Sequence, residues 1–285
     1  MNSVATNSLS TWIAGARPRT LPAAIAPVVV ATALAGKDSQ VLPALLALIV
    51  SLALQVGVNY ANDYSDGIRG TDNDRIGPMR ITASGLATPN QVRSAAFISF
   101  AVAAFAGLAL AISTSWWLIA VGALSIAAAW GYTGGKNPYG YLGLGELFVF
   151  IFFGVVATVG TFYVQTESIT SNSILASIPM GTFACALLAI NNIRDRALDA
   201  PAGKKTLAVR LGDRKARYVF VALIVFGYLA VLAMGKPWAL LTLITLPVAL
   251  QLIRGVLGSA QGRELIPFLA KTGQLQLLFA LTFSL

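Results

Sequence analysis

Two short clusters of asparagine and aspartate, 129 residues apart, are the parts of this 285-residue sequence best suited to chemistry. One reads "NDYSD" and the other "NNIRD", and each follows an almost wholly apolar stretch. Side chains four residues apart share one face of a helix, so Asn62 and Asp66 should face the same way. The same spacing relates Asn191, Asp195 and Asp199. The pattern predicts two sets of oxygen ligands that face each other across a helical bundle.

The residue types in these clusters indicate which cation they would hold. Neighbouring carboxylates repel unless cations neutralise them, and oxygen ligands without histidine or cysteine favour Mg²⁺. The sequence contains no histidine, and its one cysteine, Cys185, lies in an apolar stretch. The alternative is a set of solvated helix-end charges paired with arginines. Two matched clusters at one membrane depth favour a magnesium site.

Basic residues are interleaved with both clusters. Magnesium between carboxylates usually completes its shell with substrate phosphates, which predicts a polyanionic ligand. Nearby arginines and lysines could grip a diphosphate and stabilise the charge that builds on it as it leaves. Arg214, Lys215 and Arg217 are better explained as ordinary membrane-flanking charges. The candidates for the diphosphate are Arg75, Arg80, Arg194, Lys204, Lys205 and Arg210.

A third candidate region is the stretch "WGYTGGKNPYGYLGLGELFVFIFFG". Its glycines and proline predict a tight turn before the next apolar segment. Aromatic faces there could hold a flat aromatic substrate or a developing cation, although an interfacial tyrosine belt explains them equally well. The candidate residues for an aromatic substrate are Tyr132, Lys136, Tyr139 and Glu146.

The elements that must position these residues are membrane helices. Of all residues, 56% are hydrophobic and only 11% are charged, and apolar runs near the length that crosses a bilayer recur along the chain. We therefore predict an all-α polytopic membrane protein that forms a single domain over residues 1–285. The expected spans are 21–36, 42–61, 94–112, 115–132, 146–165, 174–192, 217–234, 237–253 and 266–284.

The distribution of positive charge predicts the orientation. With a cytoplasmic N-terminus, eighteen of the twenty lysines and arginines fall on the cytoplasmic side, and only Lys37 and Lys236 fall outside. This distribution explains the net charge of +9 without any nucleic-acid partner. The two longest loops, which carry the aspartates, then face the cytoplasm. No cleavable signal peptide is expected before the first span.

Three motifs together resemble the UbiA superfamily of intramembrane aromatic prenyltransferases. They are "NDYSDGIRGTDNDRIGPMRITASG", "YTGGKNPYGYLGLGELFVFIFFG" and "NNIRDRALDAPAGKKTLAVRLG", and the resemblance covers about residues 12–214. It implies nine transmembrane helices around a central cavity, with two aspartate-rich motifs that bind Mg²⁺ and a prenyl diphosphate. In the commoner first motif an aspartate stands where this chain has Gly70, so Asp72 or Asp74 must replace it. The ligands that the resemblance implies are Asn62, Asp63, Asp66, Asp72, Asn191, Asp195 and Asp199, with a supporting role as the alternative for Asp63.

Within the superfamily, the motifs are most similar to the branch that prenylates 1,4-dihydroxy-2-naphthoate in menaquinone biosynthesis. The resemblance implies transfer of a polyprenyl group from an allylic diphosphate, with loss of the ring carboxyl, in the cytoplasmic (inner) membrane among its lipids. The residues expected to be catalytic are Asp66, Asp195, Lys205 and Arg210. Prenylation of another aromatic acceptor is the main alternative. A secondary transporter would also carry repeats and intramembrane charges, but usually near the bilayer midplane. The start of "DYSDG" is shared with CDP-alcohol phosphotransferases, although the rest of their motif is missing.

Overall fold

The computed structural model describes residues 8–71, 77 and 79–285, and every regular element in these residues is helical. The α-helices are α1 (Leu9–Ala16), α2 (Pro22–Ala35), α3 (Val41–Arg69), α4 (Pro89–Ser113), α5 (Trp117–Gly131), α6 (Gly145–Val149), α7 (Ala157–Thr166), α8 (Ser171–Asp199), α9 (Leu207–Leu211), α10 (Asp213–Ala233), α11 (Leu246–Leu257) and α12 (Ile266–Phe283). The tighter or wider helical turns are η1 (Pro18–Thr20), η2 (Gly36–Asp38), η3 (Tyr139–Leu142), η4 (Phe150–Val156), η5 (Pro237–Thr245) and η6 (Gly262–Leu265).

The predicted membrane spans are confirmed as helices, with the number nine being approximate. In the described residues, 7 helices are long and apolar enough to cross a membrane. A bent pair, Leu9–Thr20 with Pro22–Asp38, gives up to 8, and α5 is a shorter apolar helix. The outer surface fits a bilayer, since large apolar side chains such as Phe105 and Phe226 are exposed. Which side of the membrane the N-terminus faces stays a prediction.

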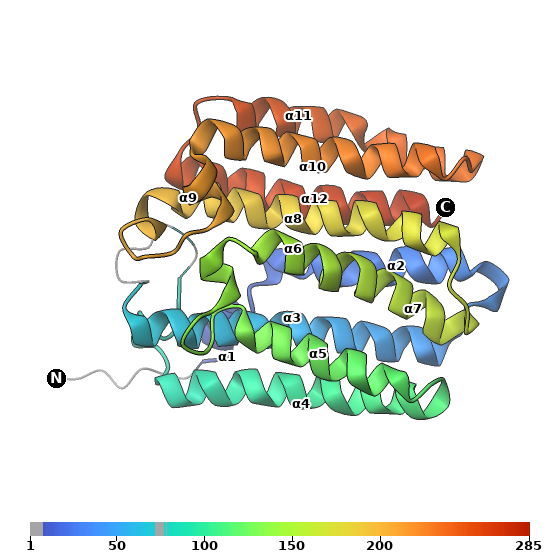
Figure 1. Ribbon diagram of the computed structural model, residues 1–285, viewed down its shortest axis with the longest axis horizontal. Coiled ribbons are helices and arrows are strands. Elements are labelled where there is room, and N and C mark those ends of the chain that lie inside the picture. The colour runs from blue at the N-terminus through green and yellow to red at the C-terminus, as the bar shows by residue number, and fades with distance from the viewer. Residues whose placement is uncertain (1–7, 72–76, 78) are drawn as a thin grey trace.

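The two helices that carry the aspartate clusters are the longest of the described helices, at 29 residues each. Both continue beyond the predicted spans, so the clusters lie on the last turns of α3 and α8 and not in loops. Gly70 ends α3 with a φ of 70°, a left-handed conformation that glycine adopts without strain. The connections that follow α3 and α8 lie at the same end of the bundle, on the left of Figure 1.

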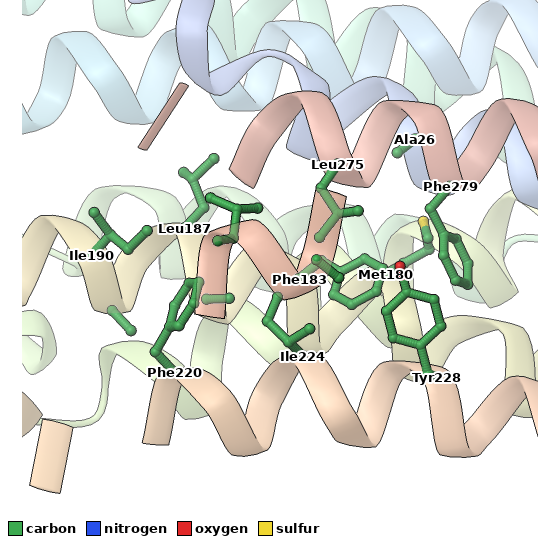
Figure 2. Packing of buried hydrophobic residues seen from close by; sticks show 14 of the residues in the cluster. Ala26, Met180, Phe183, Leu187, Ile190, Phe220, Ile224, Tyr228, Leu275 and Phe279 are labelled. Carbon is green, nitrogen blue, oxygen red and sulfur yellow. The ribbon is translucent and has the colours of Figure 1, made fainter. Parts of the chain in front are cut away.

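The main hydrophobic core lies where α2, α8, α10 and α12 meet. Phe183 of α8, Tyr228 of α10 and Phe279 of α12 pack against one another, with ring centroids between 5.0 and 5.8 Å apart (Figure 2). A second cluster joins α3 to α4 around Tyr60 and Phe100. The two clusters form separate packed walls, and α3 and α8 stand on opposite sides of the cavity between them.

Candidate active site

A cavity of about 660 Å³ lies between α3 and α8. Along α3 its wall extends from Ala47 to Asp66, which is roughly 28 Å at 1.5 Å per residue and close to the thickness of a bilayer core. Apolar residues such as Leu118 and Val164 line part of the wall. The central cavity that the sequence predicted is therefore present, with one chemically polar end.

The polar side chains of α3 form a stripe that faces this cavity. Gln55, Asn59, Asn62 and Asp66 all line it, and each is buried. Asn62 and Asp66 were predicted from the sequence, whereas Gln55 and Asn59 were not. The sequence pattern could have identified them, because polar residues spaced by four, three and four positions in an apolar helix lie on one face.

Asp66 contacts a hydroxyl and two basic side chains at the cavity. Its Oδ1 accepts a 2.5 Å hydrogen bond from the Tyr141 hydroxyl, and its Oδ2 lies 3.3 Å from Arg80 Nη2 and 3.1 Å from Lys204 Nζ. Burial and the neighbouring carboxylate raise the pKa of Tyr141, so its hydroxyl stays protonated and donates. The structure therefore brings Asp66, Arg80 and Lys204 together as the sequence predicted. Tyr141 was missed as a site residue.

Asn62 is oriented by the turn that follows α5. Its side-chain oxygen accepts a 2.7 Å hydrogen bond from the Thr133 hydroxyl. Arg69, one α3 turn beyond Asp66, donates to the backbone oxygens of Thr133 and Gly135. These bonds fix the glycine-rich turn against the end of α3.

The α8 side of the cavity carries the second cluster. Asn191, Asp195 and Asp199 all line the cavity, as their spacing predicted. Arg194 Nε and Nη2 each lie 2.7 Å from a different Asp195 oxygen, which is the two-pronged geometry of a strong ion pair. Arg194 itself is not on the cavity wall. It lies behind Asp195, where it can orient that carboxylate.

Asp63 faces away from the cavity. It is fully buried, and its two carboxylate oxygens accept the backbone N–H groups of Ile81 and Thr82 at 3.0 and 2.8 Å. These bonds hold the segment that carries Arg80. The geometry thus favours the supporting role that the sequence analysis allowed for Asp63.

The predicted catalytic residues Lys205 and Arg210 are exposed and do not line the cavity. The guanidinium of Arg210 donates to the carbonyls of Lys205 and Leu142, and the Lys205 backbone N–H donates to the Tyr141 carbonyl. Together they fasten η3 to the segment that follows α8, which places Lys204 beside Tyr141.

That Lys205–Tyr141 bond is a backbone contact of 2.9 Å, so the side chain of Lys205 takes no part in it. Lys136 is exposed and is not among the cavity-lining residues either. Tyr132 and Tyr139 do line the cavity. The Tyr139 ring stacks on Phe148 with centroids 4.0 Å apart, which gives the cavity an aromatic wall.

Glu146 lies just outside this aromatic wall, at the start of α6. Its Oε1 accepts a 2.9 Å hydrogen bond from Asn192, a cavity-lining residue of α8 that the sequence analysis did not select. Glu146 therefore orients Asn192 instead of lining the cavity itself. Two further predicted residues, Asp72 and Arg75, lie outside the described residues, as does Asp74.

The donor set at the polar end fits magnesium in chemical type. It offers amide and carboxylate oxygens only, from Asn62, Asp66, Asn191, Asp195 and Asp199. Among the residues that the structure describes, no three histidines, cysteines or acidic residues gather as a ready-made metal cage. Magnesium commonly takes one or two carboxylates and completes its shell with water and substrate phosphate, so this set suits a metal that arrives with a diphosphate.

Comparisons with known proteins agree with this geometry. The UbiA prenyltransferase family matches residues 24–271. A 1,4-dihydroxy-2-naphthoate octaprenyltransferase of Mycobacterium tuberculosis is 51% identical over 278 residues, which cover 96% of this chain and 95% of the relative. The enzyme of the same description from Escherichia coli is 38% identical over 289 residues, covering 96% of this chain and 94% of the relative.

Solved structures share the fold. A UbiA homologue from Archaeoglobus fulgidus, bound to GPP and Mg²⁺, superposes with a TM-score of 0.63 at 14% identity and covers 96% of this chain and 100% of its own. An apo UbiA homologue from Aeropyrum pernix gives a TM-score of 0.66 at 17% identity, covering 92% of this chain and 96% of its own. The family match spans most of the sequence, and the chain therefore belongs to the UbiA prenyltransferase family.

Proposed function

We propose that this protein transfers a polyprenyl group from an allylic diphosphate to 1,4-dihydroxy-2-naphthoate, with Mg²⁺ and with loss of the ring carboxyl, in menaquinone biosynthesis. Relatives up to 51% identical over nearly the whole chain carry the description 1,4-dihydroxy-2-naphthoate octaprenyltransferase. The structural observation that carries the proposal is the cavity with one polar end, where Asp66 meets Arg80 and Lys204.

The polar end suits a diphosphate, and the long apolar wall suits its prenyl tail. Arg80 and Lys204 are both buried, and their charges are held at the cavity by Asp66. A diphosphate that enters can share these two cations, which stabilise the negative charge on it as the allylic C–O bond breaks. Magnesium held by the Asp66 and Asp195 clusters would supply further positive charge to the leaving group.

The aromatic wall suits the acceptor and the allylic cation. Tyr132, Tyr139 and Phe148 line the cavity beside its polar end, and aromatic faces attract a developing cation. Bond formation at the ring carbon that bears the carboxylate, followed by departure of CO₂, returns the electron pair to the ring. Because no ring proton is removed in this sequence, the reaction needs no histidine base, and the chain has no histidine.

We place the enzyme in the cytoplasmic (inner) membrane, with the polar end of the cavity facing the cytoplasm. The support is the distribution of basic residues, eighteen of twenty of which fall on one side of the predicted topology. Labelling of a single cysteine introduced at Lys37 or at Lys136, in a Cys185→Ala background, tests this orientation in intact cells. Impermeant reagent should reach position 37 and not position 136.

The reaction is tested with the purified protein in lipid, Mg²⁺, a long allylic diphosphate and 1,4-dihydroxy-2-naphthoate, with products followed by mass spectrometry. We expect a prenylated, decarboxylated naphthalenoid that disappears when EDTA is added. The same assay is run with 4-hydroxybenzoate as the acceptor. If product forms only with 4-hydroxybenzoate, the mechanism stands and the proposed acceptor is wrong. Absence of product with either acceptor, from folded protein, would reject the proposal.

A further inference from the structure

A second, smaller cavity of about 280 Å³ lies among the last turns of α8, the first turns of α10 and η6. Three arginines line it: Arg194, Arg196 and Arg217. The other polar lining residues are Asp213 and Gln261. None of these five described residues lines the larger cavity, so the pocket is a separate feature of the same end of the bundle.

Arg194 lines this pocket and has a buried donor without an acceptor among the described residues. Its side chain has 0% exposure, and its Nε and Nη2 are both used by Asp195. Its remaining nitrogen, Nη1, is buried and finds no hydrogen-bond partner in the described part of the chain. A buried charged donor without a partner costs free energy, so an acceptor in the pocket would stabilise it.

Arg196 and Arg217 differ in how their donors are used. Arg196 Nε is also buried and has no acceptor among the described residues. Arg217, in contrast, donates to Asp213 at 2.7 Å and to the carbonyls of Val256 and Ala260. Arg217 thus secures the end of α11. Arg194 and Arg196, in contrast, each have one buried N–H group without an acceptor among the described residues.

The charges around the pocket favour an anion. Within the described residues, its three guanidinium groups form ion pairs with two carboxylates, Asp195 and Asp213. The surplus positive charge and the two buried donors are a combination that recognises phosphate oxygens. A volume of about 280 Å³ is at the small end for ligand sites, which suits a phosphate group and not a prenyl chain.

We propose that this pocket binds a phosphate group, held by Arg194 and Arg196, at a site distinct from the catalytic cavity. The phosphate could belong to free phosphate or to the headgroup of an anionic lipid, because the helix ends that form the pocket lie where a membrane span terminates. The proposal does not depend on the identity of the enzyme's substrates.

Binding to the purified full-length protein tests the proposal, with Arg196→Gln as the variant and Lys215→Gln as its control. Lys215 is an exposed residue on the first turn of α10, so its substitution removes one charge at the same end of the bundle outside the pocket. Inorganic phosphate is titrated against protein in neutral detergent by calorimetry. Retention of phosphatidic acid, with phosphatidylcholine as the reference, is followed by native mass spectrometry.

We expect wild type and Lys215→Gln to bind alike and Arg196→Gln to bind at least about tenfold more weakly, because one charge-assisted hydrogen bond is lost. Binding of inorganic phosphate would identify a soluble anion as a ligand, and selective retention of phosphatidic acid would identify a lipid headgroup. If Arg196→Gln does not fold, Gln261→Glu introduces a negative charge at an exposed residue of the pocket and should weaken binding similarly. The proposal would be overturned if the wild-type protein bound neither inorganic phosphate nor phosphatidic acid. It would also be overturned if both pocket variants bound these probes as strongly as wild type.

Discussion

At the scale of single residues, the hydrogen bond from the Tyr141 hydroxyl to Asp66 can be tested by itself. Tyr141→Phe removes the 2.5 Å hydrogen bond and leaves Arg80 and Lys204 in place. Hydrogen bonds to charged groups contribute about 1.5–3 kcal/mol, so we expect kcat/KM to fall roughly tenfold to a hundredfold. Steady-state kinetics measure this, with Tyr218→Phe on the exposed face of α10 as the control. Equal kcat/KM in the two variants would show that the bond has no role in the reaction.

Asp63 offers a test that separates a metal ligand from a supporting residue. Asp63→Asn leaves one oxygen for two backbone N–H groups, so the segment that carries Arg80 should lose one of its two anchors. We expect the KM for the prenyl diphosphate to rise severalfold, while the magnesium concentration that gives half-maximal activity stays unchanged. A shift in that magnesium concentration with an unchanged KM would instead assign Asp63 to the metal.

Helical spacing predicted which residues of α3 and α8 face the cavity, whereas the basic residues after these helices gave a mixed result: Arg80 and Lys204 line the cavity, and Lys205 and Arg210 do not. The period of the helix places Asn62 and Asp66 on one face of α3 and Asp195 with Asp199 on one face of α8, and the packing of the bundle turns both faces to the cavity. No such rule applies to Lys205 and Arg210, whose positions depend on contact between η3 and the segment after α8. Lys205 and Arg210 follow the second cluster closely in sequence. That nearness predicts that they lie at the same end of the bundle, but not whether their side chains face the cavity. Their predicted catalytic roles remain untested.

At the scale of elements, the close approach of η4 to α8 sets one wall of the cavity. A Cβ on Gly154 would lie 2.6 Å from the Gly181 Cα, so the two backbones meet where no side chain fits. We expect Gly154→Ala to lower the free energy of unfolding by about 1–3 kcal/mol, as overpacking does. Thermal unfolding in detergent measures this. Gly160→Ala, where a Cβ meets nothing within 4 Å, is the matched control and should be as stable as wild type or slightly more stable.

The helices themselves were predictable because an apolar run of bilayer length has few other stable conformations in lipid. Each expected span corresponds to a helix or to a continuous series of helical turns. The π-helical turns of η4 had no signal in the apolar sequence, since such turns depend on packing against α8. Apolar length therefore predicts where a span lies but not its internal irregularities.

At the scale of the whole molecule, the length of the cavity should decide which prenyl donors are used. Gly122 lines the cavity on α5, and a Cβ there meets nothing within 4 Å. It lies ten residues before Tyr132, or roughly 15 Å along the helix from the aromatic wall near the polar end. A large side chain at this position would fill the part of the cavity that only a long tail reaches.

We therefore expect Gly122→Trp to reduce kcat/KM for a long polyprenyl diphosphate by about fivefold to 150-fold, the effect of overpacking by about 1–3 kcal/mol. Geranyl diphosphate should react at close to the wild-type rate, since its short tail ends before the obstruction. Gly122→Ala controls for the loss of glycine, and competition between the two donors in one reaction gives the ratio directly. If both donors lose activity equally, the tail does not follow the apolar wall, because an obstruction within its path must discriminate by length.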